Sequence, residues 1–139
     1  MGLDMYLEGR KYRWTDWKNP ENDPKEDGFR IKEKILELGY WRKHPNLHGY
    51  IVEHFADGKD ECQEINITEE NIQELIDAVK NRLLPETTGF FFGKSAQNDL
   101  EIKEEMKTDL KILNDALQWL VDEKNISCEI RSIVYQASW

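Results

Sequence analysis

Nine residues from Tyr40 to His48, Tyr-Trp-Arg-Lys-His-Pro-Asn-Leu-His, combine aromatic rings, cations and imidazoles in a chain of net charge -9. The guanidinium of Arg42 is a planar fork that binds phosphate or carboxylate. A ring such as that of Trp41 offers a face on which a nucleobase stacks. The segment therefore predicts a non-enzymatic protein that captures a small anionic, nucleotide-like ligand.

Two aromatic residues outside this segment are candidate walls for the same site. Phe91 lies in a Gly-Phe-Phe-Phe-Gly run, where successive rings of a strand point to alternating sides. A competing interpretation is that Trp41 belongs to the hydrophobic core and that Arg42 and Lys43 form ion pairs with carboxylates. The predicted ligand-binding residues are Tyr40, Trp41, Arg42, Lys43, Asn46, His48, Phe91 and Trp139.

A metal site is the first catalytic alternative. His44 and His48 are four residues apart, and Cys62 or Asp60 would complete a tetrahedral set. However, Pro45 is expected to leave His44 ahead of the helix, and no Glu follows His44 as a hydrolytic zinc motif requires. We therefore predict no metal ion and no other cofactor.

A cysteine or carboxylate hydrolase is the second catalytic alternative. His48 would activate Cys62 or work with Asp60. The acidic residues around Cys62 oppose formation of a thiolate, and no complete triad is recognisable. The sequence assigns no catalytic residues.

A strongly acidic segment supports a different class of function. Residues 53–77 contain nine Asp or Glu and a single Lys, a net charge of -8. Such a segment is typical of a solvated surface, but it also suits an inhibitor or DNA mimic that binds a basic host protein. The overall acidity argues against general nucleic-acid binding.

The composition predicts one globular domain spanning residues 1–139. The hydrophobic fraction is 39% over 139 residues, enough for a sizeable core. No apolar run reaches the roughly 18 to 20 residues of a membrane span, and the first residues alternate like a strand rather than a leader. We expect a cytoplasmic protein, with both cysteines reduced.

The N-terminal half is expected to contain a strand, a loop and two helices. Period-two alternation predicts a strand over residues 2–14, and Pro and Gly residues predict an exposed loop at about 15–28. Apolar spacing predicts a helix over 29–38, ended by Gly39, and a second helix from Pro45 to Phe55.

The C-terminal half is expected to contain two strands and two helices. The strands span residues 62–67 and 127–136; one helix follows an N-cap at Thr68 and runs to residue 83, and the other runs from residue 98 or 99 to about 125. Together these elements predict an α+β fold, with a small, mainly antiparallel sheet packed against about four helices. The strand order stays open.

Several motifs resemble those of a family of small phage and prophage proteins of unassigned function. They are Gly-Leu-Asp-Met-Tyr-Leu at residues 2–7, Tyr-Trp-Arg-Lys at 40–43 with Asn46 and His48, the aromatic run at 89–93, and Tyr-Gln-Ala-Ser-Trp at 135–139. The resemblance implies a shared fold and a phage setting, where capture of a host defence signal is a conceivable purpose. His44, His54 and Ala137 depart from the family pattern.

Overall fold

An antiparallel sheet of four strands forms the centre of the computed structural model, which describes residues 2–87, 94–122 and 128–139. Its strand order is β4-β1-β6-β5, and β1 and β6 pair along their whole length. The strands are β1 (Asp4–Arg13), β4 (Glu33–Arg42), β5 (Ile65–Ile67) and β6 (Glu129–Ser138).

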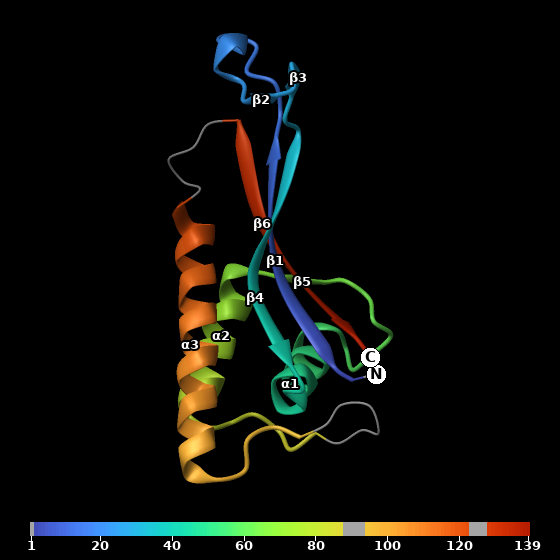
Figure 1. The fold of residues 1–139 in the computed structure, drawn as a ribbon, viewed down its shortest axis with the longest axis vertical. Coiled ribbons are helices and arrows are strands. Elements are labelled where there is room, and N and C mark those ends of the chain that lie inside the picture. The colour runs from blue at the N-terminus through green and yellow to red at the C-terminus, as the bar shows by residue number, and fades with distance from the viewer. Residues whose placement is uncertain (1, 88–93, 123–127) are drawn as a thin grey trace.

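Three α-helices within the described residues accompany the sheet (Figure 1). They are α1 (Pro45–Phe55), α2 (Glu69–Lys80) and α3 (Asp99–Val121). The predicted α+β class is therefore confirmed, but the prediction of about four helices is wrong. None of these helices is long and apolar enough to cross a membrane.

The helix predicted over residues 29–38 is wrong, because this segment forms β3 (Phe29–Arg30) and most of β4. A bulge explains the error: Leu7 pairs with Gly39 and Glu8 with Glu37, so Leu38 is an extra residue on β4. The bulge interrupts the period-two pattern, and the remaining apolar spacing imitates a helix. Gly39 does not cap a helix; a Cβ there would lie 2.3 Å from Ile112 Cγ2 of α3.

Local sequence determines the other helix starts as expected. Thr68 and Asn71 form a reciprocal capping box at α2, with the Asn71 amide 3.1 Å from Thr68 Oγ1 and the Thr68 amide 3.0 Å from Asn71 Oδ1. Asn98 caps α3 by accepting a hydrogen bond from the Glu101 amide at 2.8 Å. The predicted end of this last helix, near residue 125, lies outside the described residues.

The molecule divides into a base and an arm. We define the arm as residues 10–34 and 128–132, and the base as the other described residues. The arm contains one end of β1, β4 and β6, the short helix η1 (Pro20–Asn22) and the hairpin β2 (Lys25–Glu26) with β3, and it extends beyond the end of α3 (Figure 1). The predicted loop at 15–28 lies in it and is mainly exposed.

The hydrophobic core belongs to the base. Its fully buried members come mainly from β1, β5, β6 and all three helices, including Met5, Leu47, Leu75, Leu113 and Ile133. The arm contributes no residue to this cluster and instead exposes the large apolar side chains Tyr12, Trp14, Trp17, Phe29 and Ile130. Apolar burial therefore holds the base together, and strand pairing extends the arm from it.

Candidate functional site

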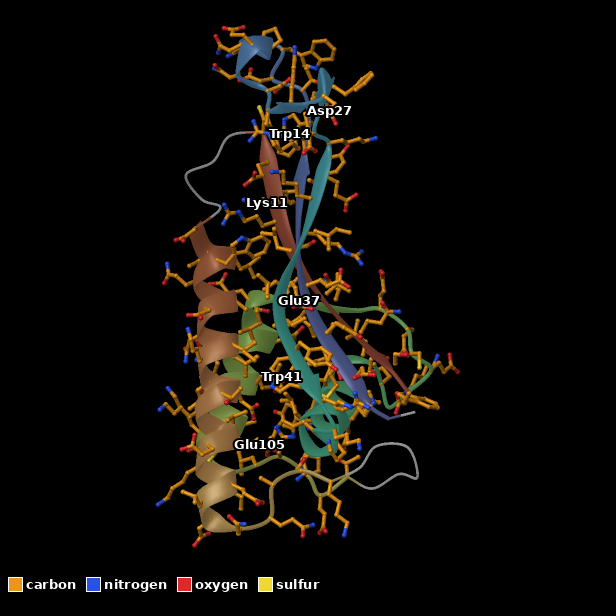
Figure 2. The ribbon with its side chains drawn as sticks, viewed as in Figure 1. Lys11, Trp14, Asp27, Glu37, Trp41 and Glu105 are labelled. Carbon is orange, nitrogen blue, oxygen red and sulfur yellow. The ribbon has the colours of Figure 1, made fainter. Side chains whose placement is uncertain are left out.

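The first three predicted ligand residues lie on β4, whereas the sequence placed them between a helix ended by Gly39 and a helix that begins at Pro45. Strand alternation sends Trp41 into the base, where it is buried (Figure 2). Tyr40 and Arg42 lie on the opposite face of the strand and are exposed. The difference arises because most of the segment predicted as a helix over 29–38 belongs to strand β4, which continues through these residues. Trp41 therefore cannot line the same pocket as Tyr40 and Arg42.

The outward residues form a small polar and aromatic group. The Tyr40 hydroxyl donates a hydrogen bond to Asp4 Oδ1, and this bond raises the pKa of Tyr40. The ring of Tyr6 lies 5.3 Å from that of Tyr40, centroid to centroid. Arg42 and Lys43 are exposed, and neither forms an ion pair within the described part of the chain, contrary to the pairing expected by the competing interpretation.

Trp41 leads instead to a buried polar cluster that we call the His44 centre: Trp41, His44, Ser95, Glu105 and Asp109. The Trp41 indole donates to Asp109 Oδ1 at 2.8 Å, and His44 Nε2 lies 2.8 Å from Asp109 Oδ2. His44 Nδ1 lies 2.9 Å from Ser95 Oγ, and Glu105 Oε1 lies 3.5 Å from His44 Nε2. His44 and Asp109 are only 3% and 1% exposed.

The hydrogen bonds of Ser95 connect the start of α1 to the His44 centre. The amide of Asn46 donates to Ser95 Oγ at 3.2 Å, and the same oxygen lies 2.9 Å from His44 Nδ1. An ionised carboxylate only accepts hydrogen bonds, so in the contact between His44 Nε2 and Asp109 Oδ2 the imidazole N–H is the donor. Ser95 is 9% exposed, which leaves a substrate little access to it as a nucleophile.

His48 belongs to a second cluster, the His48 centre, with Asp60, Tyr135 and Trp139. His48 Nδ1 lies 2.6 Å from the Tyr135 hydroxyl, and Nε2 lies 3.0 Å from both carboxylate oxygens of Asp60. The Trp139 indole donates to Asp60 Oδ1 at 3.2 Å. Burial, and then the charge of Asp60, raise the pKa of Tyr135 well above its usual range.

These two centres separate the histidines that the sequence grouped. His44 and His48 contact different carboxylates, so they do not form the zinc site that their spacing of four residues suggested as an alternative. Both ring nitrogens of His48 are engaged by Tyr135 and Asp60, and Cys62 is a free cysteine whose carbonyl accepts a hydrogen bond from Gln136. The described contacts therefore contain no Cys62–His48 pair.

The eight predicted ligand residues thus fall into three groups. Trp41 and Asn46 lie at the His44 centre, and His48 and Trp139 lie at the His48 centre. Tyr40, Arg42 and Lys43 are exposed away from both clusters. Phe91 lies outside the described residues.

Sequence reasoning missed Ser95, Glu105 and Asp109. Asp109 lies four and seven residues before the buried Leu113 and Ala116, so it occupies a core position of α3. The sequence did offer one indication of Asp109: an acidic residue stands in the apolar stripe of a helix, and a charge is rarely buried without partners. Nothing comparable in the sequence marks Ser95.

A hollow of about 190 Å³ adjoins the His44 centre. Glu105 and Asp109 form part of its wall, together with the polar residue Asn46 and the cation Arg82. The apolar and small residues of the wall are Val79, Leu84, Ala96, Ile102 and Met106. Ligands or water can therefore reach the carboxylates of the cluster from one side.

A second hollow of about 190 Å³ lies in the arm, and we call it the basic hollow. Its lining residues are Lys11, Arg13, Pro24, Ile31, Lys32, Glu33, Lys34 and Glu129. Arg13 lies 3.7 Å from Glu129. The three lysines form no ion pair or hydrogen bond through their ammonium groups within residues 2–87, 94–122 and 128–139.

Comparison with known proteins gives no match to a protein-family model, a curated protein or a solved structure.

Proposed function

We propose that the protein binds a small anionic ligand, and that the ligand occupies the basic hollow of the arm. The observation that carries this proposal is the placement of Lys11 directly opposite Lys34 in the β1–β4 register. Like charges in this position repel each other and destabilise a sheet. A bound anion would remove the repulsion and use both ammonium groups.

The row of cations continues across the sheet. On its other side Lys11 pairs in register with Arg131 of β6, whose guanidinium already contacts Glu129 and the ring of Trp119. Three cations therefore stand side by side on three neighbouring strands. Within the part of the chain that the structure describes, Lys11 and Lys34 form no ion pair, and their ammonium groups can bind phosphate or carboxylate oxygens.

The distribution of charge along the chain also favours the arm. Residues 10–34 contain eight Lys or Arg against six Asp or Glu, whereas the whole chain carries -9, so the remaining residues carry -11. An anion is thus repelled by the rest of the protein and attracted to one place. Two carboxylates, Glu33 and Glu129, also line the hollow and would limit the number of charges that the ligand can bring.

The finer identity of the ligand is proposed from an aromatic residue elsewhere in the arm. Trp14 does not line the basic hollow, but its ring is half exposed and can stack a nucleobase, which favours a nucleotide among the possible anions. In the phage setting that the motifs suggest, the protein would sequester a host defence signal of this kind.

Calorimetric titration with phosphate, pyrophosphate, citrate, ATP and cyclic AMP tests the proposal. At least one anion should bind, with an affinity that falls as salt is added. The double variant Lys11→Gln/Lys34→Gln should weaken binding at least tenfold. Lys103→Gln/Lys107→Gln, which removes the same charge from the exposed face of α3, should leave it within about twofold of the wild type.

Failure of every anion to bind the folded protein would refute this function, as would equal loss in the two double variants. The acidic-segment alternative stays a prediction. Asp60 and Glu64 of that segment contact His48 and Arg10 of the same chain, so part of its charge serves the fold. Affinity capture at two salt concentrations would test the remainder.

A further inference from the structure

We propose that the His44 centre binds a divalent transition-metal ion through His44 Nε2, Asp109 Oδ2 and Glu105 Oε1. These residues come from the turn before α1 and from two successive turns of α3. A ligand atom from each lies within 4.8 Å of the others. Spacing in the sequence could not indicate this set of ligands, because Glu105 and Asp109 are far from His44 along the chain.

The separations between donor atoms fit a metal ion. Bonds of about 2.1 Å, at angles between octahedral and tetrahedral, place neighbouring donors roughly 3.0 to 3.4 Å apart. His44 Nε2 lies 2.8 Å from Asp109 Oδ2 and 3.5 Å from Glu105 Oε1, values that bracket this range. Shifts of a few tenths of an ångström would bring both separations from Nε2 into the range, and the two carboxylates, whose oxygens lie within 4.8 Å of each other, would close on the ion as the Nε2 proton is lost.

Each proposed ligand is oriented through its other polar atom. Ser95 engages His44 Nδ1, the Trp41 indole donates to Asp109 Oδ1, and the amide of Ala96 donates to Glu105 Oε2 at 3.1 Å. One atom of each side chain is thereby turned toward a common point. Hydrogen bonds of this kind fix the direction of metal ligands and are as much a part of metal sites as the ligands themselves.

The chemistry of the side chains also suits a cation. Two carboxylate side chains converge on one imidazole, and Asp109 is almost completely buried. A divalent ion matches the two carboxylates in charge, and a buried carboxylate is stabilised when it is paired or coordinates a metal.

The adjoining hollow supplies the open side that three protein ligands require. Glu105 and Asp109 line it, so water or a small ligand can complete the coordination. One nitrogen and two carboxylate oxygens suit Zn²⁺, Mn²⁺, Fe²⁺ or Co²⁺ better than Mg²⁺ or Ca²⁺, because an imidazole is a poor ligand for the latter two. Arg82, also in the wall, would attract an anionic ligand of the ion.

The test is titration of chelator-treated, full-length protein with Zn²⁺ and Co²⁺, followed by calorimetry, thermal unfolding and Co²⁺ visible absorption. We expect one ion per chain, a rise in Tm, and visible bands of a low-coordinate Co²⁺ site. Glu105→Gln should weaken binding at least tenfold. The side-chain oxygen of the glutamine can still accept the hydrogen bond from the backbone amide of Ala96, and the side chain at position 105 is partly exposed, so the fold should persist.

Two matched variants identify the site. Glu104→Gln removes a carboxylate from the exposed face of the same helix, and Cys62→Ser removes a competing thiol; both should bind like the wild type. Wild-type affinity in folded Glu105→Gln, or absence of one-to-one binding to the unaltered protein, would overturn the proposal. The second result would identify the His44 centre as a purely structural hydrogen-bond network.

Discussion

The base and the arm share the same three long strands but are stabilised by different interactions. In the base, β1 and β6 bury Met5, Leu7, Ile133 and Tyr135 against helices. In the arm, the same strands expose Tyr12 and Ile130 and present cations on one face. A continuous sheet can therefore combine a packed core with an extension that remains accessible to ligands.

The polar groups of the two regions differ in the same way. In the base, His44 and His48 are buried and every ring nitrogen has a partner. In the arm, Asp16 and Asp23 organise the tip through bonds to backbone amides, while Lys11 and Lys34 lack carboxylate partners within the described residues. Buried groups must be satisfied within the fold, whereas exposed lysines keep their water.

The largest predicted effect comes from removing apolar contacts in the base. Leu113→Ala, at a position that is 0% exposed, should reduce the free energy of unfolding by about 2–5 kcal/mol. Ile35→Ala in β4 outside the core, where the side chain is 57% exposed, should change it by about 0.5 kcal/mol or less. Urea denaturation measures both. Similar losses would show that the exposed half of β4 contributes to the core.

An intermediate effect is expected from alkaline pH, through Tyr135. Because burial holds its folded-state pKa well above 10.0, the hydroxyl must ionise in the unfolded chain first. Its contribution to stability is fully present below about pH 10 and is lost as pH rises through the folded-state value.

Urea denaturation from pH 8 to 11 should therefore show falling stability. Tyr135→Phe should make that decline shallower, at a cost near neutral pH of about 1–3 kcal/mol for the lost partner of His48. Tyr12→Phe, in the exposed arm, is the control and should leave the slope unchanged. An unchanged slope in Tyr135→Phe would contradict the assignment.

The smallest effect should come from the ion pair that links arm and base. Arg10 Nη2 lies 2.6 Å from Glu64 Oε1, and this contact lowers the pKa of Glu64. The pair stabilises the fold above the unfolded-state pKa of Glu64, and the effect disappears as pH falls through the lower folded-state value. Because the pair is exposed, Glu64→Gln should shift the thermal midpoint only slightly, and high salt should abolish the shift. A large, salt-independent shift would contradict this view.

Most elements could be predicted because their causes are local. The capping box at Thr68, Pro45 at the start of α1 and the alternation from Asp4 to Arg13 are all visible within a few residues. The segment that became β4 could not be predicted, because its bulge and the role of Gly39 depend on β1 and on Ile112 of α3. Those partners lie far away in sequence.

The candidate sites show the same limit. The segment from Tyr40 to His48 contains residues of both polar centres, but adjacency suggested one pocket, whereas a strand and a turn send its side chains to different places. Asp109 is 65 residues from His44, and Asp60 is 75 from Tyr135. No spacing rule connects such distant pairs.

By itself, the sequence determined the α+β class, the acidic net charge and most element positions, because periodicity, capping and composition act over short distances. The tertiary structure decided which charges are buried and which remain exposed. It brought Glu105 and Asp109 to His44, and it placed Lys11 opposite Lys34. Burial and cross-strand pairing depend on how the helices and strands pack, and packing brings together residues that are far apart in the sequence.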